Sequence, residues 1–580
     1  MRTASTQLTA ASRTAALQEM TDAEGLDILV VGGGVTGAGI ALDAATRGLR
    51  TGIIDAGDWA SGTSSWSSKL VHGGLRYLYN LDFALVAEAL KERGLLLSRL
   101  APHLVKAQPF LWPLKMPVIE RSYSALGIGM YDAMALAGSR GMKTVPTQKH
   151  YSKKATLRLF PDINPKALTG AIRFYDARVD DARLVIDLVR TAAGYGALAA
   201  SRTQMIDTLK DETGRVIGVV AKDLETGQAS TIRTQHVINA TGVWTEQTEK
   251  LASEDHGLKV MTSKGVHIVV PRERISAEAG IFLRTEKSVL FIIPWQRYWI
   301  IGTTDTPYSG DYVRPVATSE DIDYILEHAN AILNQPLTRE DIIGTYAGLR
   351  PLLQPVSKDG TEASSTQVSR EHTVAEAAPG MSVIAGGKLT TYRVMAKDAV
   401  DFALGATATA RPSVTEDIPL VGAEGYPAVR AQADQIGQRF GWTAGRVTHL
   451  LDRYGAELDQ IIELIEQDST IGKPIDQAPA YLRAEVVFGL RFEGALHLED
   501  MLMRRVRLDI EQPQRGLEAA EEILELMAAE LGWDEQRVST ELSNYRTRVE
   551  NIALAQTVSD EKEASRIVTA DPEIVPRVQL

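Results

Sequence analysis

A glycine-rich turn near the N-terminus constrains the fold of this chain more than any other feature. Gly32, Gly34 and Gly37 follow an apolar run over 28–31 and open a stretch with helical spacing of apolar residues. Glycines at this spacing allow a tight turn, a close approach of backbone to a pyrophosphate, and packing of the helix on the strand. Asp55 ends the next apolar run, where a carboxylate can accept hydrogen bonds from ribose hydroxyls. The pattern predicts a dinucleotide site on a doubly wound α/β sheet.

Two later glycine turns extend this site. Ala240 and Gly242 follow one apolar run, and Gly386 and Gly387 follow another. Such distant segments converge if one doubly wound domain is assembled from separate parts of the chain. The acid at Asp55 disfavours the 2′-phosphate of NADP. A glycine turn late in the α/β part, where a flavin ring can lie over the backbone, favours FAD over NAD.

The composition excludes several kinds of chemistry. The 580 residues include no cysteine, so the chain has no disulfide, thiolate nucleophile or cysteine-ligated iron–sulfur cluster. The ten histidines form neither an HExxH motif nor a close pair, and no metal site is predicted. A formal net charge of −12 argues against nucleic-acid binding, which needs a basic surface. Redox chemistry is therefore best carried by an organic cofactor.

Changes in composition along the chain indicate several domains. Residues 1–24 are rich in Ala, Ser and Thr and are predicted to form a flexible tail. Helical spacing of apolar residues predicts a helical domain over 412–555, followed by a loose tail over 556–580. An antiparallel sheet is indicated by runs of β-branched and aromatic residues over 266–271, 288–295 and 298–303.

The hydropathy of the chain predicts no transmembrane helix, because no apolar stretch reaches about 18 residues. The nearest candidate, 122–139, is interrupted by Asp132 and is rich in Gly and Ala. A core helix is the favoured interpretation of this segment, with an interfacial amphipathic helix as the alternative.

Six ordered blocks resemble the FAD-dependent, aerobic glycerol-3-phosphate dehydrogenases, which are related to the glycine and D-amino-acid oxidases. The blocks are SGTSSWSSKLVHGGLRYL (61–78), VDDARL (179–184), KGVHIVVP (264–271), GTTD (302–305), GLRPL (348–352) and GGKLTTY (386–392). The resemblance is dense over 25–400, and EGALHLED at 493–500 is similar to the family's cap domain. Asp55 stands where the family often has Glu, and the N-terminal extension has no clear counterpart.

The resemblance implies an α/β fold with three parts. These are a discontinuous Rossmann-like FAD-binding domain, an antiparallel-sheet substrate domain interleaved with it, and a helical C-terminal cap domain. Within 25–400, the FAD-binding domain is expected at about 25–75, 170–260 and 345–400, and the substrate domain at about 76–169 and 261–344.

The resemblance also implies an activity: oxidation of sn-glycerol 3-phosphate to dihydroxyacetone phosphate by hydride transfer from C2 to flavin N5. Electrons are expected to pass to a membrane quinone, which places the enzyme in the cytoplasm, peripherally on the inner face of the cell membrane, with a homodimer possible. An oxidase that reduces O2 to H2O2 is the main alternative. A relative of D-amino-acid oxidase and a non-catalytic flavin-binding redox sensor are more distant ones.

The implied substrate site needs cations for a phosphate dianion and an acceptor for the C2 hydroxyl proton. Arg76 and Arg350 are the expected phosphate ligands, with a hydroxyl from Tyr77 beside them. The resemblance favours His267 as the base, and alternation along its strand places it on the face opposite Val266, Ile268 and Val270. Lys388 is expected at the flavin edge or the substrate phosphate.

His72 is the rival base, and its alternative role is to shape the flavin pocket. Thr203 is expected near the adenine. The full set of expected FAD ligands is Gly32, Gly34, Gly37, Asp55, Thr63, Ser64, Ser68, Lys69, His72, Thr203, Ala240, Gly242, Gly386, Gly387, Lys388, Leu389 and Thr390.

Overall fold

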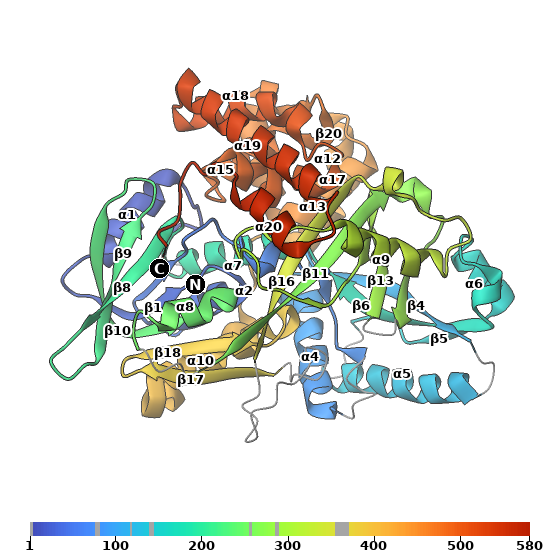
Figure 1. The fold of residues 1–580 in the computed structure, drawn as a ribbon, viewed down its shortest axis with the longest axis horizontal. Coiled ribbons are helices and arrows are strands. Elements are labelled where there is room, and N and C mark those ends of the chain that lie inside the picture. The colour runs from blue at the N-terminus through green and yellow to red at the C-terminus, as the bar shows by residue number, and fades with distance from the viewer. Residues whose placement is uncertain are drawn as a thin grey trace.

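The computed structural model describes residues 4–75, 82–115, 119–138, 144–253, 258–284, 289–353 and 371–579. Two β-sheets lie side by side, and a helical C-terminal domain sits over the region where they meet (Figure 1). This architecture confirms the predicted fold class. Within the described ranges, no helix combines the length and the apolar character that crossing a bilayer requires.

The first sheet carries the predicted glycine turns. Its strands run in the order β17-β18-β10-β1-β2-β7, and the hairpin β8–β9 extends β10. They are β1 (Leu26–Val31), β2 (Thr51–Ile54), β7 (Leu198–Ala200), β8 (Thr203–Lys210), β9 (Val216–Asp223), β10 (Ala229–Asn239), β17 (His372–Ala378) and β18 (Met381–Gly386). β1 is parallel to β2 and β10, and β10 is parallel to β18. Because parallel strands end at one edge, the turns after β1, β10 and β18 converge.

Both faces of β1 are buried, which explains its continuous apolar run. Ile28 and Val30 join a core formed with α2 (Val35–Thr46), α7 (Asp181–Gly194) and α10 (Tyr392–Leu404). Leu29 and Val31 point to the other face, where they join Met20 of the N-terminal helix. The alternation is that of a central strand with covering layers on both sides.

The second sheet has the strand order β15-β11-β14-β13-β12-β4-β6-β3, with β16 paired to β11 and β5 to β6. Its strands are β3 (Leu70–Val71), β4 (Lys106–Leu114), β5 (Lys149–Ser152), β6 (Gly170–Arg178), β11 (Val260–Pro271), β12 (Gly280–Arg284), β13 (Val289–Trp295), β14 (Tyr298–Gly302), β15 (Thr306–Pro307) and β16 (Gly344–Leu353). The helices of this part are α4 (Phe83–Leu95), α5 (Ile119–Gly138), α6 (Lys153–Leu159) and α9 (Ser319–Asn330).

The strand pairing moves two predicted domain boundaries. The sequence interpretation assigned 170–260 and 345–400 to the cofactor domain, but β6 pairs with β4 and β16 pairs with β11, so both strands belong to the second sheet. The chain returns to the first sheet only after β6, at α7. Composition could not show to which sheet these strands belong, because a buried strand has the same apolar composition in either sheet.

The C-terminal domain is mainly helical and has two apolar cores. Its helices are α11 (Tyr426–Ala431), α12 (Ala433–Phe440), α13 (Ala444–Tyr454), α14 (Leu458–Gln467), α15 (Arg483–Arg491), α16 (Leu498–Asp500), α17 (Leu508–Glu511), α18 (Ala520–Leu531) and α19 (Glu535–Ala555). A small hairpin joins β19 (Pro474–Ile475) to β20 (Ala478–Leu482). The side chains expected from helical spacing, such as Leu458, Ile461 and Ile465, form the first core.

Both chain ends are more ordered than the sequence predicts. Within 1–24, helix α1 (Ala10–Met20) begins at a Thr9 cap and packs on β7. Arg13 of this helix forms an ion pair with Asp223. Within 556–580, α20 (Glu561–Thr569) buries Ala564 and Val568. The flexible and loose tails are thus corrected to packed segments, each held by few apolar residues but several polar contacts.

Candidate functional site

The glycine turn after β1 brings two backbone segments closer than a side chain would allow. Gly32 has φ +115°, and a Cβ built there would lie 2.6 Å from the carbonyl oxygen of Ala240. A Cβ on Gly37 would overlap the Gly32 carbonyl oxygen. Gly34 is the N-cap of α2, so the start of this helix faces the turn. The close approach and the helix N-terminus together suit a bound diphosphate.

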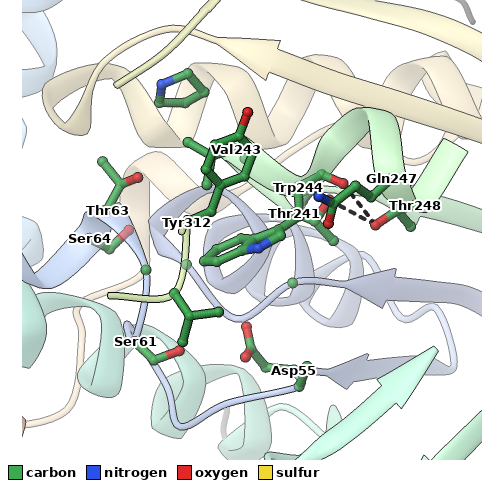
Figure 2. Close-up of a pocket in the computed structure, with 18 of the residues that line it drawn as sticks. Asp55, Ser61, Thr63, Ser64, Thr241, Val243, Trp244, Gln247, Thr248 and Tyr312 are labelled. Carbon is green, nitrogen blue, oxygen red and sulfur yellow. Dashed lines mark hydrogen bonds between the residues drawn. The ribbon is translucent and has the colours of Figure 1, made fainter. Parts of the chain in front are cut away.

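A cavity of about 750 Å³ opens beside this turn, between the first sheet and the segments around 241–248, 309–313 and 386–389. Its volume is within the usual range for small-molecule and cofactor sites, about 300–1,000 Å³. Figure 2 shows the Asp55 carboxylate and the Trp244 indole facing this space. The predicted FAD ligands that line it are Gly32, Gly34, Asp55, Thr63, Ser64, Thr203, Ala240, Gly242, Gly386, Gly387, Lys388 and Leu389.

Asp55 is held rigidly at the end of β2. The N–H of Gly33 donates to its Oδ2 at 2.5 Å and the N–H of Gly57 to its Oδ1 at 2.6 Å. Burial raises the pKa of Asp55, while the nearby Arg577 and the two N–H donors oppose that rise. The residues present therefore fit a dinucleotide, with a preformed acid for a ribose, a glycine cradle and a helix start. Arg577 comes from the predicted loose tail and was missed by the sequence reasoning.

Five predicted FAD ligands lie outside the cavity lining: Gly37, Ser68, Lys69, His72 and Thr390. Gly37 supports helix packing, as expected of the third glycine. The His72 N–H donates to Thr390 Oγ1 at 3.1 Å, and that hydroxyl contacts the His72 carbonyl at 3.1 Å. Lys69 is fully buried and donates from Nζ to Asp181 Oδ1 at 2.6 Å. The structure thus places Lys69 in an internal ion pair.

Two of the three predicted hydroxyl ligands that line the cavity, Thr63 and Ser64, come from one loop and also bind protein atoms. Ser64 Oγ accepts from the Val35 N–H at 2.9 Å, so it satisfies a donor in the first turn of α2. Thr63 Oγ1 donates to the carbonyl oxygen of Leu349 at 2.6 Å and ties the loop to β16. These bonds position the 61–64 loop between the two sheets.

His267 lies on β11 and is buried. Its Nε2 is 2.9 Å from Ser68 Oγ, and its ring stacks on Tyr346 with centroids 4.7 Å apart and planes 12° apart. Its Nδ1 is buried and has no hydrogen-bond partner within the described residues. Burial, then Arg350 and Lys69, hold the pKa of His267 well below its ordinary value. The imidazole is therefore neutral at pH 7.

Arg350 lies on β16, which pairs with β11 over ten residue positions. Its Nη2 donates to Thr303 Oγ1 at 2.9 Å and to the Thr304 carbonyl at 3.2 Å, and its Nη1 lies 3.5 Å from Asp305 Oδ1. Gly265 on β11 lies against the guanidinium, and a Cβ built there would overlap Arg350 Nη2. These contacts hold the guanidinium against β11 and the segment that follows β14 (Tyr298–Gly302).

Of the remaining predicted substrate ligands, the structure describes only Lys388. Lys388 lines the cavity as the N-cap of the short helix Leu389–Thr391. Pro351, which follows Arg350, lines the same cavity. Arg76 and Tyr77 lie outside the described residues. His267 contacts Ser68 and Tyr346, and the sequence did not predict this group of three. Only the folded arrangement of the loop, β11 and β16 brings them into contact.

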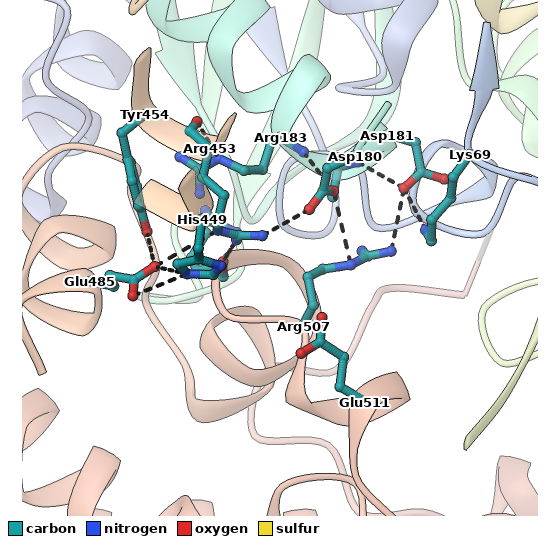
Figure 3. Close-up of polar contacts among 12 residues, drawn as sticks. Lys69, Asp180, Asp181, Arg183, His449, Arg453, Tyr454, Glu485, Arg507 and Glu511 are labelled. Carbon is teal, nitrogen blue, oxygen red and sulfur yellow. Dashed lines mark hydrogen bonds and ion pairs between the residues drawn. The ribbon is translucent and has the colours of Figure 1, made fainter. Parts of the chain in front are cut away.

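Buried ion pairs connect this region to the helical domain (Figure 3). Arg507 Nη2 donates to Asp181 Oδ1 at 3.3 Å, and Asp181 Oδ2 accepts from the N–H and Oγ of Ser67 at 3.0 and 2.7 Å. Burial alone would raise the pKa of Asp180, but Arg507 and other cations lower it to about 2. Because Asp181 accepts two hydrogen bonds from Ser67, it fixes the loop that also carries Ser68.

Comparison with known proteins gives consistent matches. The family described as FAD dependent oxidoreductase matches residues 27–393, and the C-terminal domain of alpha-glycerophosphate oxidase matches 413–538. Glycerol-3-phosphate dehydrogenase 2 of Mycobacterium tuberculosis is 49% identical, over 95% of this chain and 92% of its own length. Glycerol-3-phosphate dehydrogenase of Mycobacterium leprae is 48% identical, over 96% and 94%. The structure of the Bacillus halodurans glycerol-3-phosphate dehydrogenase with FAD has 31% identity and a TM-score of 0.75, over 93% of this chain and 98% of that one.

Proposed function

We propose that this chain, which belongs to the FAD-dependent oxidoreductases and within them to the glycerol-3-phosphate dehydrogenases, oxidises sn-glycerol 3-phosphate to dihydroxyacetone phosphate. One observation supports this beyond family membership: His267 on β11 is neutral, and Arg350 on the paired strand β16 is close enough for its charge to lower the pKa of His267. A phosphorylated alcohol needs both a phosphate ligand and a proton acceptor. FAD, when bound, supplies flavin N5 as the acceptor of the C2 hydride.

His267 takes the C2 hydroxyl proton in this proposal. If the Nε2–H donates to Ser68 Oγ, the lone pair is on Nδ1, the atom without a partner within the described residues. The Tyr346 ring beneath His267 limits its rotation. Because burial keeps the imidazole neutral, it can accept a proton without first losing one. His72 is the alternative base.

Arg350 binds the phosphate group in this proposal, with Arg76, Tyr77 and Lys388. The contacts of Arg350 with Thr303 and Thr304 orient the planar guanidinium, whose geometry matches two phosphate oxygens. Lys388 lies at the cavity lining, where its charge can face either the substrate phosphate or the flavin edge.

Anaerobic mixing of the holoenzyme with sn-glycerol 3-phosphate tests the reaction. We expect the flavin absorbance to bleach, and dihydroxyacetone phosphate to form in an equal amount. A D-amino acid serves as the control substrate and should leave the absorbance unchanged. Failure of sn-glycerol 3-phosphate to bleach a bound flavin would refute the proposal and favour a non-catalytic flavoprotein.

We propose a membrane quinone as the electron acceptor. The second candidate is O2, because residues 413–538 match a domain described from alpha-glycerophosphate oxidase. A comparison of turnover with a soluble quinone analogue and with O2 distinguishes them. Substrate-dependent H2O2 release as fast as quinone reduction would establish the oxidase instead.

A quinone acceptor requires peripheral contact with the inner face of the cell membrane. Support comes from α4 and α5, which pack together and leave Phe83 42% and Leu136 49% exposed. Ile128 and Tyr131 of α5 are buried. Co-sedimentation with vesicles should fall when Phe83 and Leu136 are both changed to Ser. Sedimentation equilibrium tests whether the protein is a homodimer.

A further inference from the structure

The C-terminal segment 571–579 lies along the cofactor cavity. It leaves α20 and reaches the first sheet beside β8 (Figure 1). Glu573, Arg577 and Val578 are among its residues that line the cavity with Asp55 and Trp244. A segment expected to be loose instead closes one side of a binding site.

Polar contacts hold this segment at both ends. The side chain of Gln204, on β8, accepts from the Val578 N–H at 2.8 Å and donates to the Val578 carbonyl at 2.8 Å. At the other end, Asp571 accepts from Asn551 Nδ2 at 2.6 Å and pairs with Arg314 at 2.7 Å. Fixing both ends limits the positions open to the residues between them.

Arg577 is the cation that this arrangement directs at the cavity. Its guanidinium lies 5.0 Å from the Trp244 ring centroid, within the distance of a cation–π contact. A Cβ built on Gly57 would lie 2.9 Å from its Nη2, so it sits against the turn that holds Asp55. Burial lowers the pKa of Arg577 and Asp55 opposes that change, but an arginine stays charged at neutral pH.

The surroundings of Arg577 identify the half of the cofactor that it meets. Asp55 directly follows β2, the position at which a dinucleotide fold binds the ribose of its adenosine half. A guanidinium beside that acid can donate to diphosphate oxygens and can stack on a planar base. The expected flavin-ring position, at Gly386 and Gly387, belongs to a different strand end of the same cavity.

We propose that residues 571–579 form a strap that retains FAD, and that Arg577 binds the adenosine diphosphate half of the cofactor. The inference rests on the family's cofactor and on no assignment of the substrate. The strap can therefore be refuted while the proposed reaction stands. Equally, the reaction can be refuted while the strap stands.

The test compares Arg577→Ala and Arg577→Lys with Arg566→Ala, a control at an exposed arginine of the neighbouring α20. Apoprotein is titrated with FAD and, separately, with ADP, which carries only the adenosine diphosphate half. We expect Arg577→Ala to raise the Kd for both by about tenfold, equivalent to about 1.4 kcal/mol. Arg577→Lys should keep part of the affinity, and Arg566→Ala all of it.

The rate of FAD release tests the strap as a whole. Holoenzyme that ends after Ala570 should release FAD at least as fast as Arg577→Ala, followed by the fluorescence of freed flavin. An unchanged Kd for FAD in Arg577→Ala, or weaker FAD binding with unchanged ADP binding, would overturn the role of Arg577. Release from the shortened chain at the wild-type rate would overturn the strap.

Discussion

Asp181→Asn should cost about 3 kcal/mol of unfolding free energy at pH 7, because it removes the carboxylate between two buried cations. Asp181 Oδ1 accepts from Lys69 Nζ at 2.6 Å and from Arg507 Nη2 at 3.3 Å. The side chains of Lys69 and Arg507 are 1% and 2% exposed, so water cannot replace the lost charge. Asparagine keeps the size of the side chain, but it removes the charge and replaces one of the two acceptor oxygens by an NH2 donor.

The two cations contribute differently to this cost. Burial, then Arg507, lowers the pKa of Lys69 to about 8, although Asp181 and Asp180 oppose the change. At pH 7 its share is therefore capped at about 1.4 kcal/mol, the cost of giving up its proton. Arg507 cannot escape in this way, and breaking a buried pair from one side costs about 3–5 kcal/mol. Its second acidic neighbour, Asp180 at 3.9 Å, keeps the total near the lower end.

The assay is urea unfolding of the holoenzyme, followed by tryptophan fluorescence at fixed FAD concentration. Asp187→Asn is a matched control on the same helix. Asp187 is also buried, but burial raises its pKa to about 7, so its charge is much less favoured in the folded protein. The control should lose less than about 1 kcal/mol. Equal losses in the two variants would refute the reasoning.

Three further predictions concern the site and the pH. His267→Ala should slow flavin reduction in stopped flow by about 100-fold or more while FAD stays bound; an unaltered rate would move the base role elsewhere. Arg350→Ala should raise KM for glycerol 3-phosphate by about tenfold or more, with partial recovery in Arg350→Lys; an unchanged KM removes it from the phosphate site. Burial opposes the charge on His497, but the hydrogen bonds that its ring donates to Glu225 and Glu541 raise its pKa to about 9. Its stabilising contribution is thus complete below pH about 6.5 and disappears as pH rises through about 9, a total near 3 kcal/mol. Denaturation of the wild type and His497→Gln across this range should show the difference shrink.

The backbone geometry of the candidate cofactor site was largely predictable, because its signals are local. Gly32 needs a positive φ and a close backbone approach, and both requirements appear in the sequence as a glycine beside an apolar strand. The convergence of Ala240 and Gly386 on the same edge follows from parallel pairing, which a doubly wound fold imposes. No sequence pattern indicated a role for Arg577, because a charged residue near a chain end is usually predicted to be exposed to solvent.

The proposed substrate region was less predictable, because its arrangement depends on contacts between distant segments. Asp181 begins α7 directly after the chain leaves the second sheet, and its partners Lys69 and Arg507 are 112 and 326 positions away. No spacing rule connects residues so far apart. These contacts nevertheless fix Ser67 and, next to it, the Ser68 hydroxyl that meets His267. Through Arg507, the helical domain therefore helps to position the proposed base. Loss of the contact between Arg507 and Asp181 should impair flavin reduction as well as stability.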